Sequence, residues 1–175
     1  MNKALATFLF IFLIQKSFCQ PAKFSTYLQV QYTNTLSDQT KNNNPWSLGA
    51  GVQLVLNNQY KLKPIAELTI DGYFEDDKVL RITSDGKEFE RVNTTVNFLA
   101  GMAYHPTQQV FLSFAAGPGL INKQTLLCIK PSIGLFFNSN QKFSGRFSYI
   151  NVFNRGQFSK EDFSSISISL STRLF

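Results

Sequence analysis

Four charged residues stand in segments where large apolar side chains alternate with small or polar ones: Glu67, Asp71, Lys130 and Arg146. Successive side chains of a β-strand point to opposite faces, and all four charges share the small, polar face. Inside a closed sheet, two acids and two bases can pair, whereas an unpaired buried charge costs several kcal/mol. We predict an ion-pair network across the interior that acts as a structural plug. A proton or ion path is the alternative function for the same residues.

A second candidate for chemistry is His105, which is the only histidine of the chain. A His paired with a Ser could act as a lipid deacylase or acyltransferase. His105 precedes Pro106 in a short turn and falls in the inward register, away from a lipid substrate. We therefore expect a hydrogen-bonded turn histidine and no catalytic site, with the lipid-modifying enzyme kept as an alternative.

The cysteines predict neither a disulfide nor a metal site. Cys19 lies at the end of an N-terminal leader, so Cys128 is the only thiol expected in the mature chain. One Cys and one His cannot form a structural zinc site. No cofactor is predicted.

The strands that position these residues follow from a two-residue period, which recurs in eight segments of about ten residues, the length that a tilted membrane-spanning strand needs. We predict strands at Phe24–Thr33, Trp46–Leu56, Leu62–Phe74, Thr94–Tyr104, Val110–Ile121, Leu126–Phe137, Lys142–Phe153 and Phe163–Phe175, with a turn at Asn122–Thr125. One face is rich in Leu, Phe and Val, and the other in Gly, Ala and Ser. Water-facing surfaces seldom carry rows of Gly and Ala, so we expect the small residues inside and the large ones against lipid.

The connections between these segments alternate in length. Those at 57–59, 106–109 and 138–141 are short and polar, whereas those at 34–45, 75–92 and 154–162 are longer, and the turn at 122–125 is the one short exception on the long side. Long and short connections at opposite ends are typical of outer-membrane barrels, whose long loops are extracellular.

The longest connection contains a second predicted site. Asp85-Gly86 is a two-residue hairpin signal between short β-prone runs, so the two flanking strands are expected to continue beyond the membrane as a charged hairpin. Such an exposed edge can pair with a strand of an extracellular protein, and a solvated loop is the equally open alternative. The candidate binding residues are Arg81, Asp85, Gly86, Lys87, Glu88, Glu90 and Arg91.

Residues 1–19 have the layout of a cleaved signal peptide, with Lys3, then an apolar run from Ala4 to Ile14, then a cleavage site before Gln20. Residues 20–175 then form one barrel domain. Removal of Lys3 and Lys16 leaves 15 basic and 11 acidic residues, and the bases are scattered. No nucleic-acid partner is expected.

The layout resembles the small eight-stranded outer-membrane β-barrels of Bacteroidota, the porin-family or outer-membrane β-barrel domain. The resemblance rests on Ser47-Leu48-Gly49-Ala50-Gly51, Lys63–Leu68, Phe114–Gly119 and Thr172-Arg173-Leu174-Phe175. It implies an all-β, eight-stranded, antiparallel up-and-down transmembrane β-barrel in the cell outer membrane, in contact with outer-membrane lipid. It also implies recognition of the C-terminal strand by the barrel assembly machinery, although the outward register ends at Leu174 and leaves Phe175 out of phase. A soluble lipocalin-like barrel is the remaining alternative, but the Gly-x-Trp signature is absent before Trp46.

Overall fold

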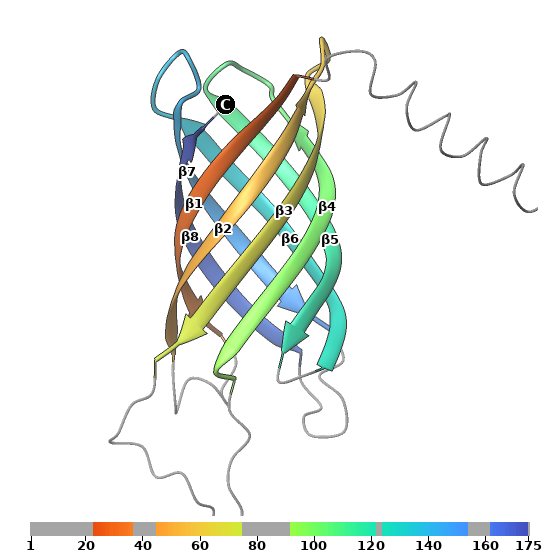
Figure 1. The fold of residues 1–175 in the computed structure, drawn as a ribbon, viewed down its shortest axis with the longest axis vertical. Helices are drawn as coiled ribbons and strands as arrows, with labels where there is room; N and C mark the ends of the chain where they lie inside the picture. Colours follow the sequence, from red (N-terminus) through yellow and green to blue (C-terminus); the bar gives the residue numbers. More distant parts are fainter. Residues whose placement is uncertain (1–22, 37–44, 75–91, 122–123, 154–161, 175) are drawn as a thin grey trace, which may run out of the picture.

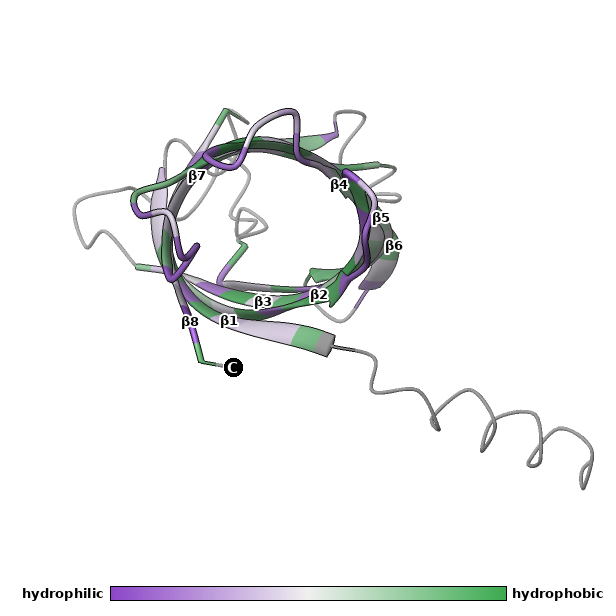
Figure 2. Ribbon diagram, turned by 90° about the horizontal axis from the view of Figure 1, so that it is seen from above, coloured by the Kyte–Doolittle hydropathy of each residue, from purple (hydrophilic) through white to green (hydrophobic). Residues whose placement is uncertain are grey.

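The chain folds into a closed β-barrel of eight antiparallel strands (Figure 1). The computed structural model describes residues 23–36, 45–74, 92–121, 124–153 and 162–174. The strands are β1 (Lys23–Thr35), β2 (Trp46–Asn57), β3 (Leu62–Tyr73), β4 (Thr94–Tyr104), β5 (Val110–Ile121), β6 (Gln124–Phe136), β7 (Phe143–Val152) and β8 (Phe163–Arg173). Each pairs with its neighbour in sequence, and β1 pairs with β8 to close the ring, as the view along the axis shows (Figure 2). The predicted all-β, eight-stranded fold is confirmed.

The burial pattern is inverted relative to a soluble barrel. Large apolar side chains on the outer wall are exposed, such as Val30 at 59% and Ile168 at 57%, whereas their neighbours Gln31 and Ser167 are buried. The alternation along β8 shows this most clearly, because Ser165, Ser167 and Ser169 point inward between outward apolar residues. The small and polar register therefore fills the interior, as the sequence predicted.

The interior is layered along the barrel axis. At the end where the short turns lie, Tyr27, His105, Phe111 and Phe136 form a ring cluster with centroid separations of 5.0–6.3 Å. At the opposite end the apolar side chains Tyr73, Val92, Ile121, Val152 and Phe163 are buried, together with polar ones such as Ser47 and Asn151. The ion-paired charges and the glutamines lie between these two layers.

Small residues of the interior leave room for the large ones. A Cβ added at Gly134 would overlap the ring of Phe111, which lies against it from the neighbouring strand. A Cβ at Gly49 would overlap the carboxylate of Asp71. A narrow barrel can hold ring and charged side chains only where the opposite wall carries none.

Some predicted boundaries and segments differ from the structure or lie outside it. Strand β6 begins at Gln124, inside the turn predicted at Asn122–Thr125, and β8 ends at Arg173. The expected signal peptide at 1–19, the hairpin at 75–91 with all its candidate binding residues, and Phe175 lie outside the described residues. No helix among the described residues is long and apolar enough to cross a membrane.

Candidate functional site: the charged interior

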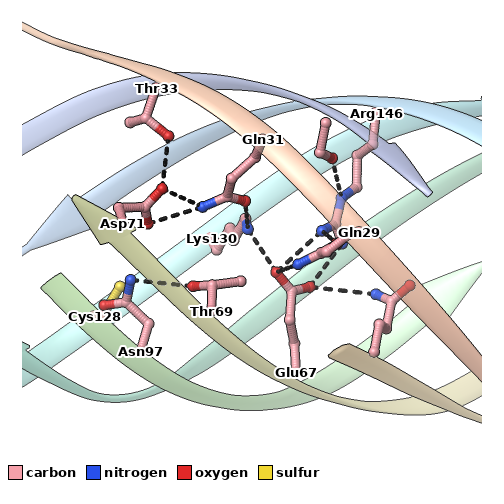
Figure 3. Close-up of polar contacts among 12 residues, drawn as sticks. Gln29, Gln31, Thr33, Glu67, Thr69, Asp71, Asn97, Cys128, Lys130 and Arg146 are labelled. Carbon is pink, nitrogen blue, oxygen red and sulfur yellow. Dashed lines mark hydrogen bonds and ion pairs between the residues drawn. The ribbon is translucent and has the colours of Figure 1, made fainter. Parts of the chain in front are cut away.

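The interior charges come from opposite walls of the barrel, because β3 pairs with neither β6 nor β7. Glu67 lies on β3, Lys130 on β6 and Arg146 on β7, and each side chain points into the barrel, where it is at most 4% exposed (Figure 3). Glu67 Oε1 lies 2.5 Å from Lys130 Nζ, and Glu67 Oε2 lies 2.7 Å from Arg146 Nη1. Arg146 Nη2 also donates to Glu67 Oε1 at 3.0 Å. One carboxylate thus bridges two cations from the opposite wall.

Three glutamines complete the coordination of these charges. Gln29 accepts from Arg146 Nη2 at 2.5 Å and donates to Glu67 Oε1 at 3.1 Å. Gln53 donates to Glu67 Oε2 at 3.3 Å, and Gln31 accepts from Lys130 Nζ at 3.3 Å. An amide can donate and accept at once, so each glutamine can satisfy both signs of charge. The sequence placed these glutamines on the polar face, but it did not identify them as members of the network.

Asp71 lies at one side of this cluster and is held by neutral donors. It accepts from Gln31 Nε2 at 2.7 and 2.8 Å, from Thr33 at 3.2 Å and from Thr95 at 3.5 Å. Within the described residues it makes no direct ion pair with Lys130 or Arg146, whose ion pairs are both with Glu67. Gln31 instead connects it to Lys130. Asp71 lies four residues from Glu67 along β3, two same-face positions further along the strand, with Thr69 between them.

The interior as a whole balances two carboxylates against two cations. The two apolar layers described above separate these groups from either end of the barrel. Near the short-turn end, the cavity lined by Tyr27, Gln53, His105 and Phe136 has a volume of about 20 Å³. That is room for about one water molecule. In addition, the hydroxyl oxygens of Ser47, Ser148 and Ser167 have no hydrogen-bond partner among the described residues. This arrangement favours a static plug over a continuous proton path.

His105 contacts aromatic rings. Its ring stacks on Phe111 at 5.8 Å and on Phe136 at 5.9 Å, and its Nδ1 has no hydrogen-bond partner in the described part of the chain. The predicted inward position is therefore correct, and a hydrogen bond of this turn histidine is made by its backbone, whose N–H donates to the carbonyl of Lys61 at 2.8 Å. Burial, with a smaller contribution from the charge of Lys63, lowers the pKa of His105 to about 4. A neutral ring between two phenylalanines is poorly placed to activate a serine.

The described residues contain no group of three or more His, Cys, Asp or Glu side chains that could hold a metal ion. Cys128 is a free, fully buried thiol on β6. The candidate site is thus the ion-paired interior.

The comparisons with known proteins identify the fold. No protein-family model matches the sequence, and no match was found among curated proteins. Solved structures do match. The attachment invasion locus protein Ail of Yersinia pestis is 12% identical, with a TM-score of 0.55 over 86% of this chain and 97% of that one. Neisserial surface protein A is 8% identical, with a TM-score of 0.56 over the same shares of the two chains.

A third match is a de novo designed transmembrane β-barrel, which is 12% identical with a TM-score of 0.50 over 89% of this chain and 98% of that one. At these identities the likeness concerns the fold alone. The chain has the fold of small outer-membrane β-barrels.

Proposed function

We propose that the protein is an integral outer-membrane β-barrel with a closed interior, which acts at the cell surface through its longer connections. The barrel serves as a rigid anchor, and the ion-paired interior stabilises it. The proposal includes export by the signal peptide at 1–19 and membership of the porin-family barrels of Bacteroidota. It also includes assembly through the C-terminal strand and binding of an extracellular protein by the hairpin at 75–91.

The observation that carries the proposal is the exposed apolar wall. Large apolar side chains on all eight strands are about half exposed, among them Val30, Leu48, Ile70, Phe98, Phe114, Ile133, Phe147 and Ile168. A soluble protein rarely exposes a contiguous apolar surface beyond a few hundred Å². In a bilayer the same surface is in its preferred solvent, and the closed barrel leaves no backbone edge unpaired.

A surface role is supported by the ends of the barrel and by the similar structures. The connections that follow β1, β3 and β7 are the long ones, and long connections of such barrels face the outside of the cell. Two of the similar structures are named as a surface protein and as an attachment invasion protein. Loops carry function when a rigid scaffold positions them.

The test is extraction of sedimented outer membranes with sodium carbonate from cells that express the full chain. We expect the protein to remain in the membrane pellet, because carbonate releases peripheral proteins but not inserted barrels. Recovery of the folded barrel in the carbonate wash, or in buffer without detergent, would establish a soluble barrel instead.

The orientation is tested by protease added to sealed cells. Cleavage is expected within 75–91 and not at the turn Asn138–Gln141. If the protease cuts Asn138–Gln141 in sealed cells, the short turns are extracellular and the proposed orientation is reversed.

A further inference from the structure

The charges outside the interior divide unequally between the two ends of the barrel. Of the 11 acidic residues, two are the interior Glu67 and Asp71. The other nine fall between β1 and β2, between β3 and β4, or between β7 and β8: Asp38, Glu75, Asp76, Asp77, Asp85, Glu88, Glu90, Glu161 and Asp162. The end with the short turns has no acidic residue at all, yet Lys23, Lys61, Lys63, Lys142 and Arg173 lie there.

These cations stand at the edge of the apolar wall. Lys23, Lys61, Lys142 and Arg173 are each followed directly by an outward apolar residue, namely Phe24, Leu62, Phe143 and Leu174, all of them about half exposed. The ammonium group of Lys142 lies 5.7 Å from the ring centre of Phe143. Tyr60, beside Lys61, is 76% exposed. When a lysine lies one residue beyond an apolar surface, its stem can follow that surface while its charge reaches the headgroup layer of a bilayer.

The cations are spread around the rim. Lys142, Arg173 and Lys23 lie at the ends of the consecutive strands β7, β8 and β1, and the backbone N–H of Arg173 donates to the carbonyl of Lys142 at 2.7 Å. Lys61 precedes β3, four strands around the ring from β7, so it lies on the opposite side of the rim from Lys142. The turns at 106–109 and 138–141 contain no charged residue. No ion pair joins Lys61, Lys63, Lys142 or Arg173 to an acidic side chain in the described part of the chain.

We propose that this rim binds the phosphate groups of anionic phospholipids in the leaflet on the short-turn side, with Lys61 and Lys142 as separate contacts on its two sides. The inference rests on the proposed membrane insertion. Phosphate esters supply the missing negative charge, and their acyl chains lie against the apolar residues next to each cation. A dissolved anion would gain nothing from those apolar neighbours, which favours a lipid as the source of the phosphate.

Lys63 provides a matched control, because it has the same charge at the same end but is less exposed than Lys61 and Lys142. It lines the mouth of the barrel together with His105 and Gln141. The mouth has a volume of about 360 Å³ and Lys61 also reaches it, so a dissolved anion would bind there. Removal of the Lys63 charge weakens that binding while leaving the outer rim intact.

The experiment reconstitutes the full chain in phosphatidylcholine vesicles and measures how strongly spin-labelled phosphatidylglycerol and spin-labelled phosphatidylcholine associate with it. The wild-type chain is expected to prefer phosphatidylglycerol, and the preference to weaken as salt rises. Lys61→Gln with Lys142→Gln should reduce the preference by about fivefold for each charge at low salt. Lys61→Arg with Lys142→Arg should retain it, and so should Lys63→Gln.

Equal association of both lipids with the wild-type chain overturns the inference. A loss of phosphatidylglycerol preference in Lys63→Gln as large as the loss in the double variant also overturns it. Displacement of the lipid by inorganic phosphate at constant ionic strength does the same, because either result assigns the anion to the mouth of the barrel. Failure of the proposed function is distinguishable, because a chain that does not insert immobilises neither spin-labelled lipid. If the chain inserts but shows no preference between the two headgroups, the rim site is disproved and the proposed membrane insertion stands.

Discussion

Arg146 contributes a bidentate ion pair to Glu67 and a hydrogen bond to Gln29, all away from water. Arg146→Met should lower the free energy of unfolding by about 3–5 kcal/mol, because two carboxylates would then face a single cation. Urea unfolding in detergent measures the change. The exposed Lys142→Gln serves as the control and should stay within about 0.5 kcal/mol of the wild-type chain.

The double variant Arg146→Met with Glu67→Gln tests whether the cost arises from charge. It leaves Lys130 and Asp71 as the only charges of the ion-paired interior, so the net charge there returns to zero. We expect the double variant to lose less free energy of unfolding than the two single variants lose together. Strict additivity would show that Arg146 stabilises the barrel through packing rather than through its charge.

His105 is expected to make stability depend on pH. Its pKa is lowered from 6.5 to about 4 in the folded barrel, so between these values the unfolded chain binds a proton that the folded chain does not. The free energy of unfolding should therefore fall as the pH drops from 6.5 towards 4, and His105 should contribute no slope above this range. His105→Phe keeps the aromatic stack without a titrating group, and its difference from the wild-type chain isolates the effect.

The imidazole resonances of this single histidine allow a direct measurement by NMR. They should titrate near pH 4 in the folded barrel. A midpoint near 6.5 would mean that the ring is hydrated and not stacked between Phe111 and Phe136.

Among the elements, β6 depends on a glycine. The ring of Phe111 occupies the space where Gly134 has no side chain, so Gly134→Ala should destabilise the barrel by about 1–3 kcal/mol through overpacking. Gly72→Ala is the control, because the nearest atom to its added Cβ is the Leu48 carbonyl oxygen at 3.9 Å. Combining Gly134→Ala with Phe111→Leu should recover part of the loss. Equal effects at Gly134 and Gly72 would mean that the ring moves aside freely.

The strands themselves could be predicted because a two-residue period fixes the direction of every side chain once one is known. Ser165, Ser167 and Ser169 on β8 give that direction without ambiguity, and all eight strands were found within a few residues of their bounds. The interior contacts could not be predicted in the same way. They depend on how far each strand is staggered around the barrel, which sets whether Asp71 or Gln31 meets Lys130.

His105 also shows that strand alternation predicts the direction of a side chain but not its contacts. Its inward direction followed from the alternation, but the rings of Phe111 and Phe136 come from β5 and β6 and approach it only through the closed topology. Similarly, Gln29 and Gln31 could be placed inside the barrel from their register, whereas their partners on β3, β6 and β7 depend on the stagger.

For the whole molecule, the apolar wall predicts a depth-dependent effect of charge. Phe143 and Phe147 lie on the same strand, point outward and are each 47% exposed. Phe147 is at the middle of β7, so Phe147→Arg should cost about 2–4 kcal/mol in a bilayer, whereas Phe143→Arg at the rim should cost about 0–1 kcal/mol. Unfolding titrations in phospholipid vesicles compare them. Equal costs at both positions would argue against a membrane-spanning wall.

The closed interior predicts that the barrel conducts poorly. In planar bilayers we expect no stable porin-sized conductance, because ring side chains, an ion-paired layer and an apolar layer follow one another along the axis. A steady large conductance from the unmutated protein would contradict the plug.

The pairing of β1 with β8 determines when folding can finish. The other seven ladders join neighbours in sequence and can form as local hairpins, but this seam brings together residues as distant as Tyr27 and Arg173. Contacts of such long range are slow to form, because the loop between them must first be closed. Until β8 arrives, both edge strands present unpaired N–H and C=O groups to whatever lies nearby. A chain truncated before Phe163 should therefore remain an open, aggregation-prone sheet, so the eighth strand decides whether the seven before it reach a closed fold.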